Sequence, residues 1–276
     1  MTDTAGDAAL AYDELPLPPT LTPLVRAVWH LRGAGPAPDA EPIVPDGCVE
    51  IIVNLGDPVE QYLDGRVARQ PARMLVGQIT GPTVIRPTGR IDIWGVRVHP
   101  WALRQFLGVP GRELVNVALP LDALPRPLGA AVAAFEDAAA AGRTGGALLA
   151  PLVRRAAAVG PVDRVARPLV EAATNRAHAT SVAALARELG LGARRVQQLF
   201  REEVGLAPKF LLRLQRFQRA LRLSRERPDL TWGRVAARCG YHDQAHLVRE
   251  CRELAGCPPS ALGVGGTGMT DVFVAG

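Results

Sequence analysis

Hydrophobic positions in the first half of the chain fall in short runs that predict β-strands. Residues 49–53 are a short, mainly apolar run ended by Asn54 and Gly56, which fits a buried strand. Within residues 62–67 an Asp-Gly pair separates two short apolar segments, the usual signal of a tight hairpin. Residues 74–79 and 91–98 are further predicted strands. The first half is therefore expected to be rich in β-structure.

Helical patterns follow the last of these strands. Pro100 is expected to open a helix that runs to Leu107, because a proline at the first helical position removes no hydrogen bond. Residues 130–141 are Ala-rich and predict a helix, and a second helix is predicted over residues 147–159. The Gly-Pro pair at 160–161 then predicts a domain boundary.

Beyond Val162 the apolar spacing is helical throughout. A long helix is predicted from about Pro208 to Arg227, with a proline at its start and another after its end. Apolar side chains at helical spacing mark the inner faces of the short helices around it. They are Val182, Leu185, Ala186 and Leu189, then Val196, Leu199 and Phe200, then Val235, Ala236 and Cys239, then Leu247, Cys251 and Leu254.

This helical part contains an internal repeat. Ala186-x-x-x-Gly190 matches Ala236-x-x-x-Gly240, and Arg201-Glu202-x-x-Gly205-x-x-Pro208 matches Arg252-Glu253-x-x-Gly256-x-x-Pro259. Each copy predicts a short helix, a turn that contains glycine, and a second short helix. The joining helix of about 20 residues spans roughly 30 Å. Successive major grooves on one side of B-DNA lie about 34 Å apart, so two recognition helices could face one side of a duplex.

Charge is unevenly distributed along the chain. Residues 1–160 hold 14 Arg against 16 Asp and Glu, whereas residues 161–263 hold 18 Lys and Arg against 10 Asp and Glu. A basic helical segment indicates a polyanionic partner, although a solvated helical surface would also explain the charge alone. Five arginines of the long helix are expected to face partly phosphate and partly solvent, namely Arg213, Arg216, Arg219, Arg222 and Arg225.

Residues 163–262 resemble the DNA-binding domain of the AraC/XylS family of transcription regulators, through residues 181–190, 195–205, 235–246 and 256–262. The resemblance implies recognition helices at about 193–204 and 243–254. It implies base contacts from Arg194, Gln197, Gln198, Gln244, His246 and Arg249, and phosphate contacts from Arg195 and Arg201. Arg pairs with guanine and Gln with adenine, each good pair contributing about 1–3 kcal/mol of discrimination.

The sequence departs from the family where the first recognition helix begins. Gly192 stands where a Ser or Thr cap is usual, so this helix start should be weaker by a few tenths of a kcal/mol.

The N-terminal half resembles a sensor-like domain of unknown function that precedes such DNA-binding domains in some family members. Residues 45–56, 76–78 and 95–100 carry this resemblance. It implies a β-rich, barrel-like module that binds an effector or helps the protein to dimerise.

The predicted fold class is α+β, with a β-rich N-terminal domain and an all-α C-terminal domain in which a long helix joins two helix-turn-helix units. The expected segments are a disordered N-terminus (1–20), a sensor or dimerisation domain (21–160), a DNA-binding domain (161–263) and a flexible tail (264–276). Four cysteines without a CxxC pair give no disulfide framework, and no apolar run is long enough for a membrane span. A cytoplasmic protein is therefore expected.

The resemblance implies a sequence-specific transcription regulator rather than an enzyme, with double-stranded DNA as its partner and neither cofactor nor metal. A small-molecule effector and a homodimer remain open. The alternative is an effector-binding or interaction module whose helical domain does not bind DNA.

Two other hypotheses are disfavoured by the sequence. Cys239, His242, His246 and Cys251 have a spacing that suggests zinc, but the helical register turns Cys239 inward and His246 outward. Cys48 could be a nucleophile with His99 or His30 as its base, but no oxyanion-hole signature accompanies it.

Overall fold

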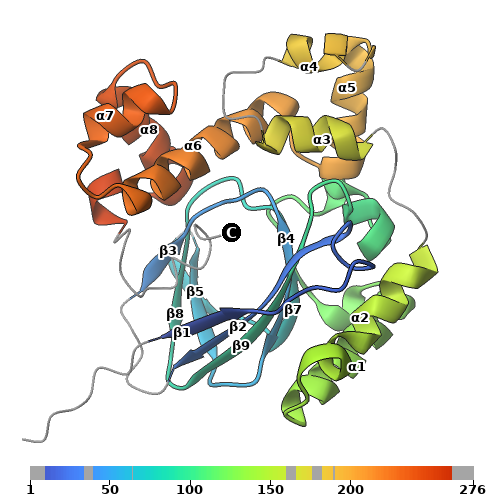
Figure 1. The fold of residues 1–276 in the computed structure, drawn as a ribbon. Helices are drawn as coiled ribbons and strands as arrows, with labels where there is room; N and C mark the ends of the chain where they lie inside the picture. Colours follow the sequence, from blue (N-terminus) through green and yellow to red (C-terminus); the bar gives the residue numbers. More distant parts are fainter. Residues whose placement is uncertain are drawn as a thin grey trace, which may run out of the picture.

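The computed structural model describes residues 10–33, 40–63, 65–159, 166–175, 182–188 and 190–262. Its N-terminal part consists of two antiparallel sheets that face each other (Figure 1). The larger sheet has the order β1-β2-β9-β4-β7-β10 and the smaller β3-β8-β5-β6. The strands are β1 (Ala11–Glu14), β2 (Val25–Gly33), β3 (Glu41–Ile43), β4 (Val49–Asn54), β5 (Val59–Leu63), β6 (Arg66–Arg69), β7 (Arg73–Val76), β8 (Thr83–Pro87), β9 (Ile91–Val98) and β10 (Ala118–Pro120).

The central strands of the larger sheet are buried on both faces, which explains why they appear in the sequence as nearly continuous apolar runs. Alternate residues point to opposite faces of a strand. Trp29 of β2 and Ile93 of β9 pack with Val59 of the smaller sheet, in the space between the sheets. Trp94 of β9 points the other way and meets the ring of Phe135 edge-on, with ring centroids 6.0 Å apart.

Phe135 belongs to the first of two helices that cover the outer face of the larger sheet, α1 (Arg126–Ala140) and α2 (Gly145–Val159). These helices confirm the two predicted for this region. The helix predicted from Pro100 is shorter than expected. It is a π-helical turn, Leu103–Leu107, that ends at Gly108 with a φ of 78°.

The expectation of a disordered N-terminus is wrong for the part that the structure describes. Residues Ala11–Glu14 form β1, which pairs with β2 from Ala11 opposite Arg32 to Glu14 opposite Trp29. Tyr12 lies against the Trp29 ring, with centroids 6.1 Å apart. β1 thus covers both the edge of β2 and apolar surface beside Trp29, which makes an ordered strand favourable. The predicted boundary at 160–161 and the tail at 264–276 lie outside the described residues.

The C-terminal part is helical, as predicted. Two helix-turn-helix units lie at opposite ends of one long helix, α6 (Figure 1). Its 19 residues span about 28 Å at 1.5 Å per residue. The helices are α3 (Ala166–Asn175), α4 (Val182–Glu188), α5 (Ala193–Leu199), which continues into a π-helical turn (Phe200–Val204), α6 (Pro208–Glu226), α7 (Trp232–Arg238) and α8 (Gln244–Ala255).

The two facing sheets of the N-terminal part are called the barrel below. The barrel and the helical part share a continuous apolar core. Two glycines permit close approach at their junction. A Cβ on Gly111 would lie 2.5 Å from the backbone nitrogen of Gly205, so main chain packs directly on main chain there. Gly205 also has a φ of 87°, a left-handed conformation that glycine adopts without strain.

We predict that Gly111→Ala loosens this junction. The added methyl group has no room, and overpacking of this kind costs about 1–3 kcal/mol. Thermal unfolding should occur at a lower temperature, and limited proteolysis should cut more readily between the two parts. Gly146→Ala is the matched control, because a Cβ there meets nothing within 4 Å and alanine is favourable in a helix. Equal stability of the two variants would contradict the close packing at Gly111.

Candidate nucleic-acid interface and barrel cavity

The first predicted recognition helix corresponds to α5 and the π-helical turn that follows it. Val196, Leu199 and Phe200 are buried and anchor its inner face. Its first residue follows Gly192, which provides no side-chain cap, as the sequence indicated. The outward side chains form one surface hollow, to which Arg194, Gln197, Gln198 and Arg201 contribute. Arg195 is also exposed and donates a hydrogen bond from Nη1 to Gln198 Oε1, 3.3 Å away.

The second recognition helix, α8, begins after Asp243, whose carboxylate accepts a hydrogen bond from the backbone N–H of His246 at 2.7 Å. Gln244 and Arg249 are exposed on its outer side. His246 is half-buried, and its ring meets the Tyr241 ring edge-on with centroids 5.2 Å apart. The structure therefore keeps Gln244 and Arg249 free to face a partner, whereas part of His246 packs within its own unit.

A buried carboxylate fixes α8 on the long helix. Glu250 is 3% exposed and accepts hydrogen bonds from Arg213 Nε at 2.8 Å, Arg216 Nη2 at 2.7 Å and the Tyr241 hydroxyl at 2.5 Å. Burial and the neighbouring Glu250 raise the pKa of Tyr241, so its hydroxyl remains a donor. The expectation that Arg213 and Arg216 face phosphate or solvent is therefore corrected. Their charges compensate Glu250 inside the domain.

We predict that Glu250→Ala lowers the free energy of unfolding by about 1.5–3 kcal/mol, because it removes the shared acceptor of the buried Tyr241 hydroxyl and of Arg213 and Arg216, which are each 30% exposed. Glu253→Ala is the matched control on the same helix, since Glu253 also pairs with Arg213 but is 63% exposed. Its loss should cost at most about 1 kcal/mol. Urea unfolding of both variants measures the difference. Similar values would show that Glu250 does not fix α8.

A basic residue of the N-terminal part, which the sequence did not indicate, lies beside the first recognition helix. Arg112, in the short turn Gly111–Glu113, lines the same hollow as Arg194, Gln197, Gln198 and Arg201. Nothing in the local sequence marks it. Arg112 reaches the hollow because its neighbour Gly111 packs on Gly205, just after the first recognition helix.

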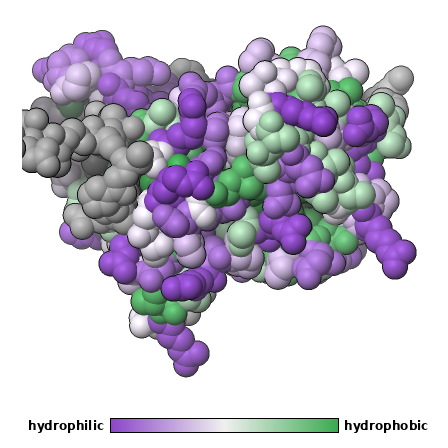
Figure 2. All heavy atoms as spheres, turned by 90° about the horizontal axis from the view of Figure 1, so that it is seen from below, coloured by the Kyte–Doolittle hydropathy of each residue, from purple (hydrophilic) through white to green (hydrophobic). Residues whose placement is uncertain are grey.

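A cavity of about 500 Å³ lies between the two sheets. Ligand sites in proteins commonly have volumes of about 300–1,000 Å³. From below, hydrophilic residues are spread among hydrophobic ones on the surface (Figure 2), and Val67 is the one large apolar side chain that is mostly exposed among the described residues. The concentrated apolar surface is thus inside the barrel. The polar side chains of the cavity wall are Asp46, Cys48, Glu50, Gln61, Gln70, Thr80, Thr83 and Asn116.

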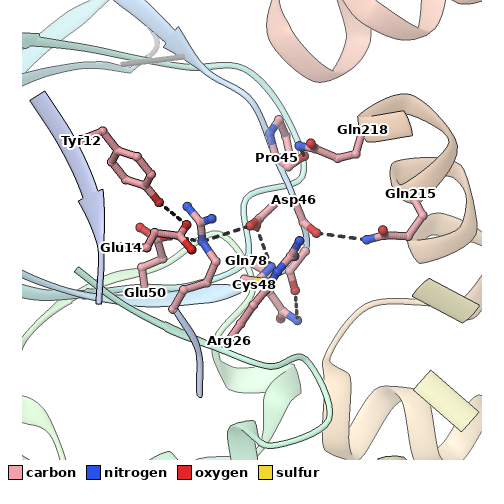
Figure 3. Close-up of polar contacts among 12 residues, drawn as sticks. Tyr12, Glu14, Arg26, Pro45, Asp46, Cys48, Glu50, Gln78, Gln215 and Gln218 are labelled. Carbon is pink, nitrogen blue, oxygen red and sulfur yellow. Dashed lines mark hydrogen bonds and ion pairs between the residues drawn. The ribbon is translucent and has the colours of Figure 1, made fainter. Parts of the chain in front are cut away.

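A charged cluster backs one part of this wall (Figure 3). Glu50 of β4 lies directly across from Arg97 of β9, and Arg97 Nε is 2.6 Å from Glu50 Oε1. The same nitrogen is 3.4 Å from Asp46 Oδ2. Arg97 is completely buried. Burial raises the pKa of Glu50, and the positive charge of Arg97 opposes that rise.

Cys48 lines the cavity without the features of a nucleophile. Burial raises the pKa of its thiol to about 12, so the thiol is neutral at physiological pH. Its Sγ lies 3.6 Å from Arg26 Nη1. The two histidines considered as its base have other partners, Asp92 for His30 and the Thr22 carbonyl for His99.

The segment that carries Asp46 and Cys48 also contacts the long helix of the DNA-binding part. Gln218 Nε2 donates a hydrogen bond to the Pro45 carbonyl at 2.6 Å, and Gln215 Nε2 donates one to the Asp46 carbonyl at 3.2 Å (Figure 3). The Asp46 side chain therefore lines the cavity while its backbone is bonded to α6.

A second bridge runs from the same segment to the end of the first recognition helix. Gln78 is completely buried, and its Nε2 donates to the Gly47 carbonyl at 3.3 Å and to the Val204 carbonyl at 2.5 Å. Segment 45–47 is thus connected to the end of the first recognition helix, through Gln78, and to the long helix α6 that follows it.

The described part of the chain contains no cluster of three His, Cys, Asp or Glu side chains placed to hold a metal ion. Cys239 is buried, whereas His242 is exposed and pairs with Asp243. None of the helices described is both long and apolar enough to cross a membrane.

Two family models match the chain. Residues 185–263 match a helix-turn-helix domain, and residues 14–120 match a domain of unknown function, DUF6597. No curated protein matches the sequence.

Solved structures that the chain matches include ToxT from Vibrio cholerae, at 9% identity over 94% of this chain and 100% of that one, with a TM-score of 0.48. A DNA-binding transcriptional dual regulator from Escherichia coli K-12 is 28% identical over 37% of this chain and 89% of that one, with a TM-score of 0.31. The AraC-like transcriptional activator CuxR is 14% identical over 73% of this chain and 83% of its own, with a TM-score of 0.29.

The duplicated helix-turn-helix units and the family match define a DNA-binding transcription regulator. The helix-turn-helix domain is of the AraC type, and it follows a β-rich DUF6597 domain in the same chain. The class is one of regulators rather than of enzymes.

Proposed function

We propose that this protein is a cytoplasmic one-component regulator that binds promoter DNA with both recognition helices at once. The observation that carries the proposal is that both helices expose polar and basic side chains while one rigid helix of about 28 Å separates their units. That length is close to the roughly 34 Å between successive major grooves on one side of a duplex. The partner is double-stranded DNA.

The proposed base contacts come from the side chains on the outer faces of the two helices. Arg suits guanine and Gln suits adenine in the major groove. Arg195 and Arg201 are assigned to phosphates, which position the protein without specifying sequence. The assigned base contacts are Arg194, Gln197, Gln198, Gln244, His246 and Arg249, of which half-buried His246 has the least freedom to reach a base.

Arg112 is proposed as an additional phosphate contact supplied by the N-terminal domain. It shares a hollow with Arg194 and Arg201 and is about half exposed, with 46% of its side-chain surface accessible. A cation in that place would meet the DNA backbone beside the groove that α5 enters. The N-terminal domain would then take part directly in DNA binding.

The cavity is the proposed effector site. Support comes from the segment 45–47, in which Asp46 lines the cavity and the carbonyls of Pro45 and Asp46 accept hydrogen bonds from Gln218 and Gln215 of α6. A ligand that moved this segment would alter the position of α6 and of the helix-turn-helix units at its ends. Control by an effector therefore needs no contact between the effector and DNA. A homodimer remains a prediction.

Selection of bound duplexes from a random pool tests the DNA-binding roles. The wild-type chain should enrich one motif. We predict that Arg194→Ala relaxes the preference at one base position by about tenfold, because a bidentate contact is lost. Arg201→Ala should weaken binding to all sequences alike and reduce the dependence of log affinity on log salt by about one.

Failure to enrich any motif at low salt would favour the alternative, an interaction module that does not bind DNA. Identical behaviour of the two variants would show that the assignment of the helix face is wrong.

We predict that Arg112→Ala weakens binding to every sequence severalfold and also reduces the salt dependence by about one, because one phosphate contact is lost. Arg126→Ala is the matched control, since Arg126 is an exposed arginine of the same domain on α1 and lies outside the hollow. Fluorescence anisotropy at several salt concentrations measures both effects. Tighter binding by Arg112→Ala would mean that the N-terminal domain obstructs α5.

A further inference from the structure

The wall of the barrel cavity has an unusual charge composition for this chain. The sequence contains 32 Lys and Arg residues. Yet the residues that line the cavity in the described structure include two carboxylates, Asp46 and Glu50, and no Arg, Lys or His. Any charge that the wall presents to a ligand is therefore negative.

Two arginines lie behind the wall, and one of them, Arg26, has its Nη1 3.6 Å from Sγ of the wall residue Cys48. Arg97 is completely buried and does not line the cavity, while its Nε is held 2.6 Å from Glu50 and 3.4 Å from Asp46. An anionic ligand would meet the carboxylates before it could approach Arg97. Repulsion between like charges is strong where water is excluded, so an anion is disfavoured in this cavity.

The rest of the wall suits an apolar molecule with a positive end. Trp29 lines the cavity and is an aromatic residue of the kind that attracts cations. Most of the remaining surface is aliphatic, for which burial of hydrocarbon is favourable. It is provided by Leu31, Ile52, Val59, Met74, Ile85 and Ile93.

We propose that the barrel cavity binds an apolar small molecule that carries a protonated amine, with the ammonium group directed to Asp46 and Glu50 and the hydrocarbon among the aliphatic side chains. This assignment names the chemical class of the effector and rests on the proposed function only where it concerns control of DNA binding. Asp46 is the point of connection, because it lines the cavity, its Oδ1 accepts a hydrogen bond from the Cys48 N–H at 2.8 Å, and its carbonyl accepts one from Gln215 of α6.

Three probes with one apolar body separate the head-group chemistries: 4-phenylbutylamine, 4-phenylbutan-1-ol and 4-phenylbutyrate. Thermal unfolding of the full chain is measured without DNA at increasing concentrations of each probe. A ligand that binds only the folded state raises the unfolding temperature in a saturable way. The amine should raise it most, the alcohol less, and the carboxylate should leave it unchanged. An equal or larger rise with the carboxylate would overturn the proposal.

Matched variants locate the binding site. Asp46→Asn keeps the shape of the side chain but removes its charge, and should lower the affinity for the amine about tenfold while leaving the alcohol nearly unaffected. Glu60→Gln is the control, because Glu60 pairs with Arg86 on the same barrel but does not line the cavity. An unchanged affinity for the amine in folded Asp46→Asn would also overturn the proposal. Asp46 is preferred to Glu50 here because removal of Glu50 deprives buried Arg97 of its closest partner.

A second readout keeps ligand class and regulation distinct. The amine should change the affinity of the wild-type chain for its selected duplex and should not change that of the double variant Gln215→Leu, Gln218→Leu, which lacks both side-chain contacts to segment 45–47. A rise in unfolding temperature without a change in DNA affinity would overturn control by this cavity but leave the ligand class standing. Absence of any selected duplex would count against the proposed function alone.

Discussion

The relation between the barrel and the DNA-binding helices depends on one buried amide. Gln78 is fully enclosed, and its Nε2 donates to the carbonyls of Gly47 and Val204, one from each half of the protein. A buried carbonyl without a partner costs about 1–3 kcal/mol, so separation of the halves must either hydrate the Val204 carbonyl or leave it unpaired. Close packing of Gly111 on Gly205 adds a steric requirement at the same place. The two halves are therefore docked in a defined orientation.

This orientation has consequences on both sides of the junction. On the DNA side it brings Arg112 of the barrel domain to the hollow formed by α5. On the barrel side it places segment 45–47 between the cavity and α6, where its carbonyls accept hydrogen bonds from Gln215 and Gln218. A change in the shape of the cavity wall at Asp46 would therefore be passed to α6 through the hydrogen bonds of segment 45–47.

Arginine has two separate roles in the helical half. Arg213 and Arg216 compensate the charge of the buried Glu250 carboxylate and so fix α8 on the long helix. Arg194, Arg201 and Arg249 remain exposed on the recognition helices. The net charge of the helical half therefore overestimates how much basic charge a polyanion can reach, because some arginines form ion pairs within the protein. The exposed part is what the proposed DNA interface depends on.

Local sequence determined the helices of the C-terminal half, their internal repeat and five of the ten strands described, namely β4, β5, β6, β7 and β9, because apolar spacing and the positions of glycine and proline act over a few residues. It also indicated which side of α5 and α8 faces outward. Only the tertiary structure decided that Ala11–Glu14 is a strand, that Arg213 and Arg216 turn inward, that Arg112 joins the hollow at α5, and that Asp46 and Glu50 meet in one cavity. These features depend on contacts between residues far apart in the chain, and such contacts leave no periodic signal in the sequence.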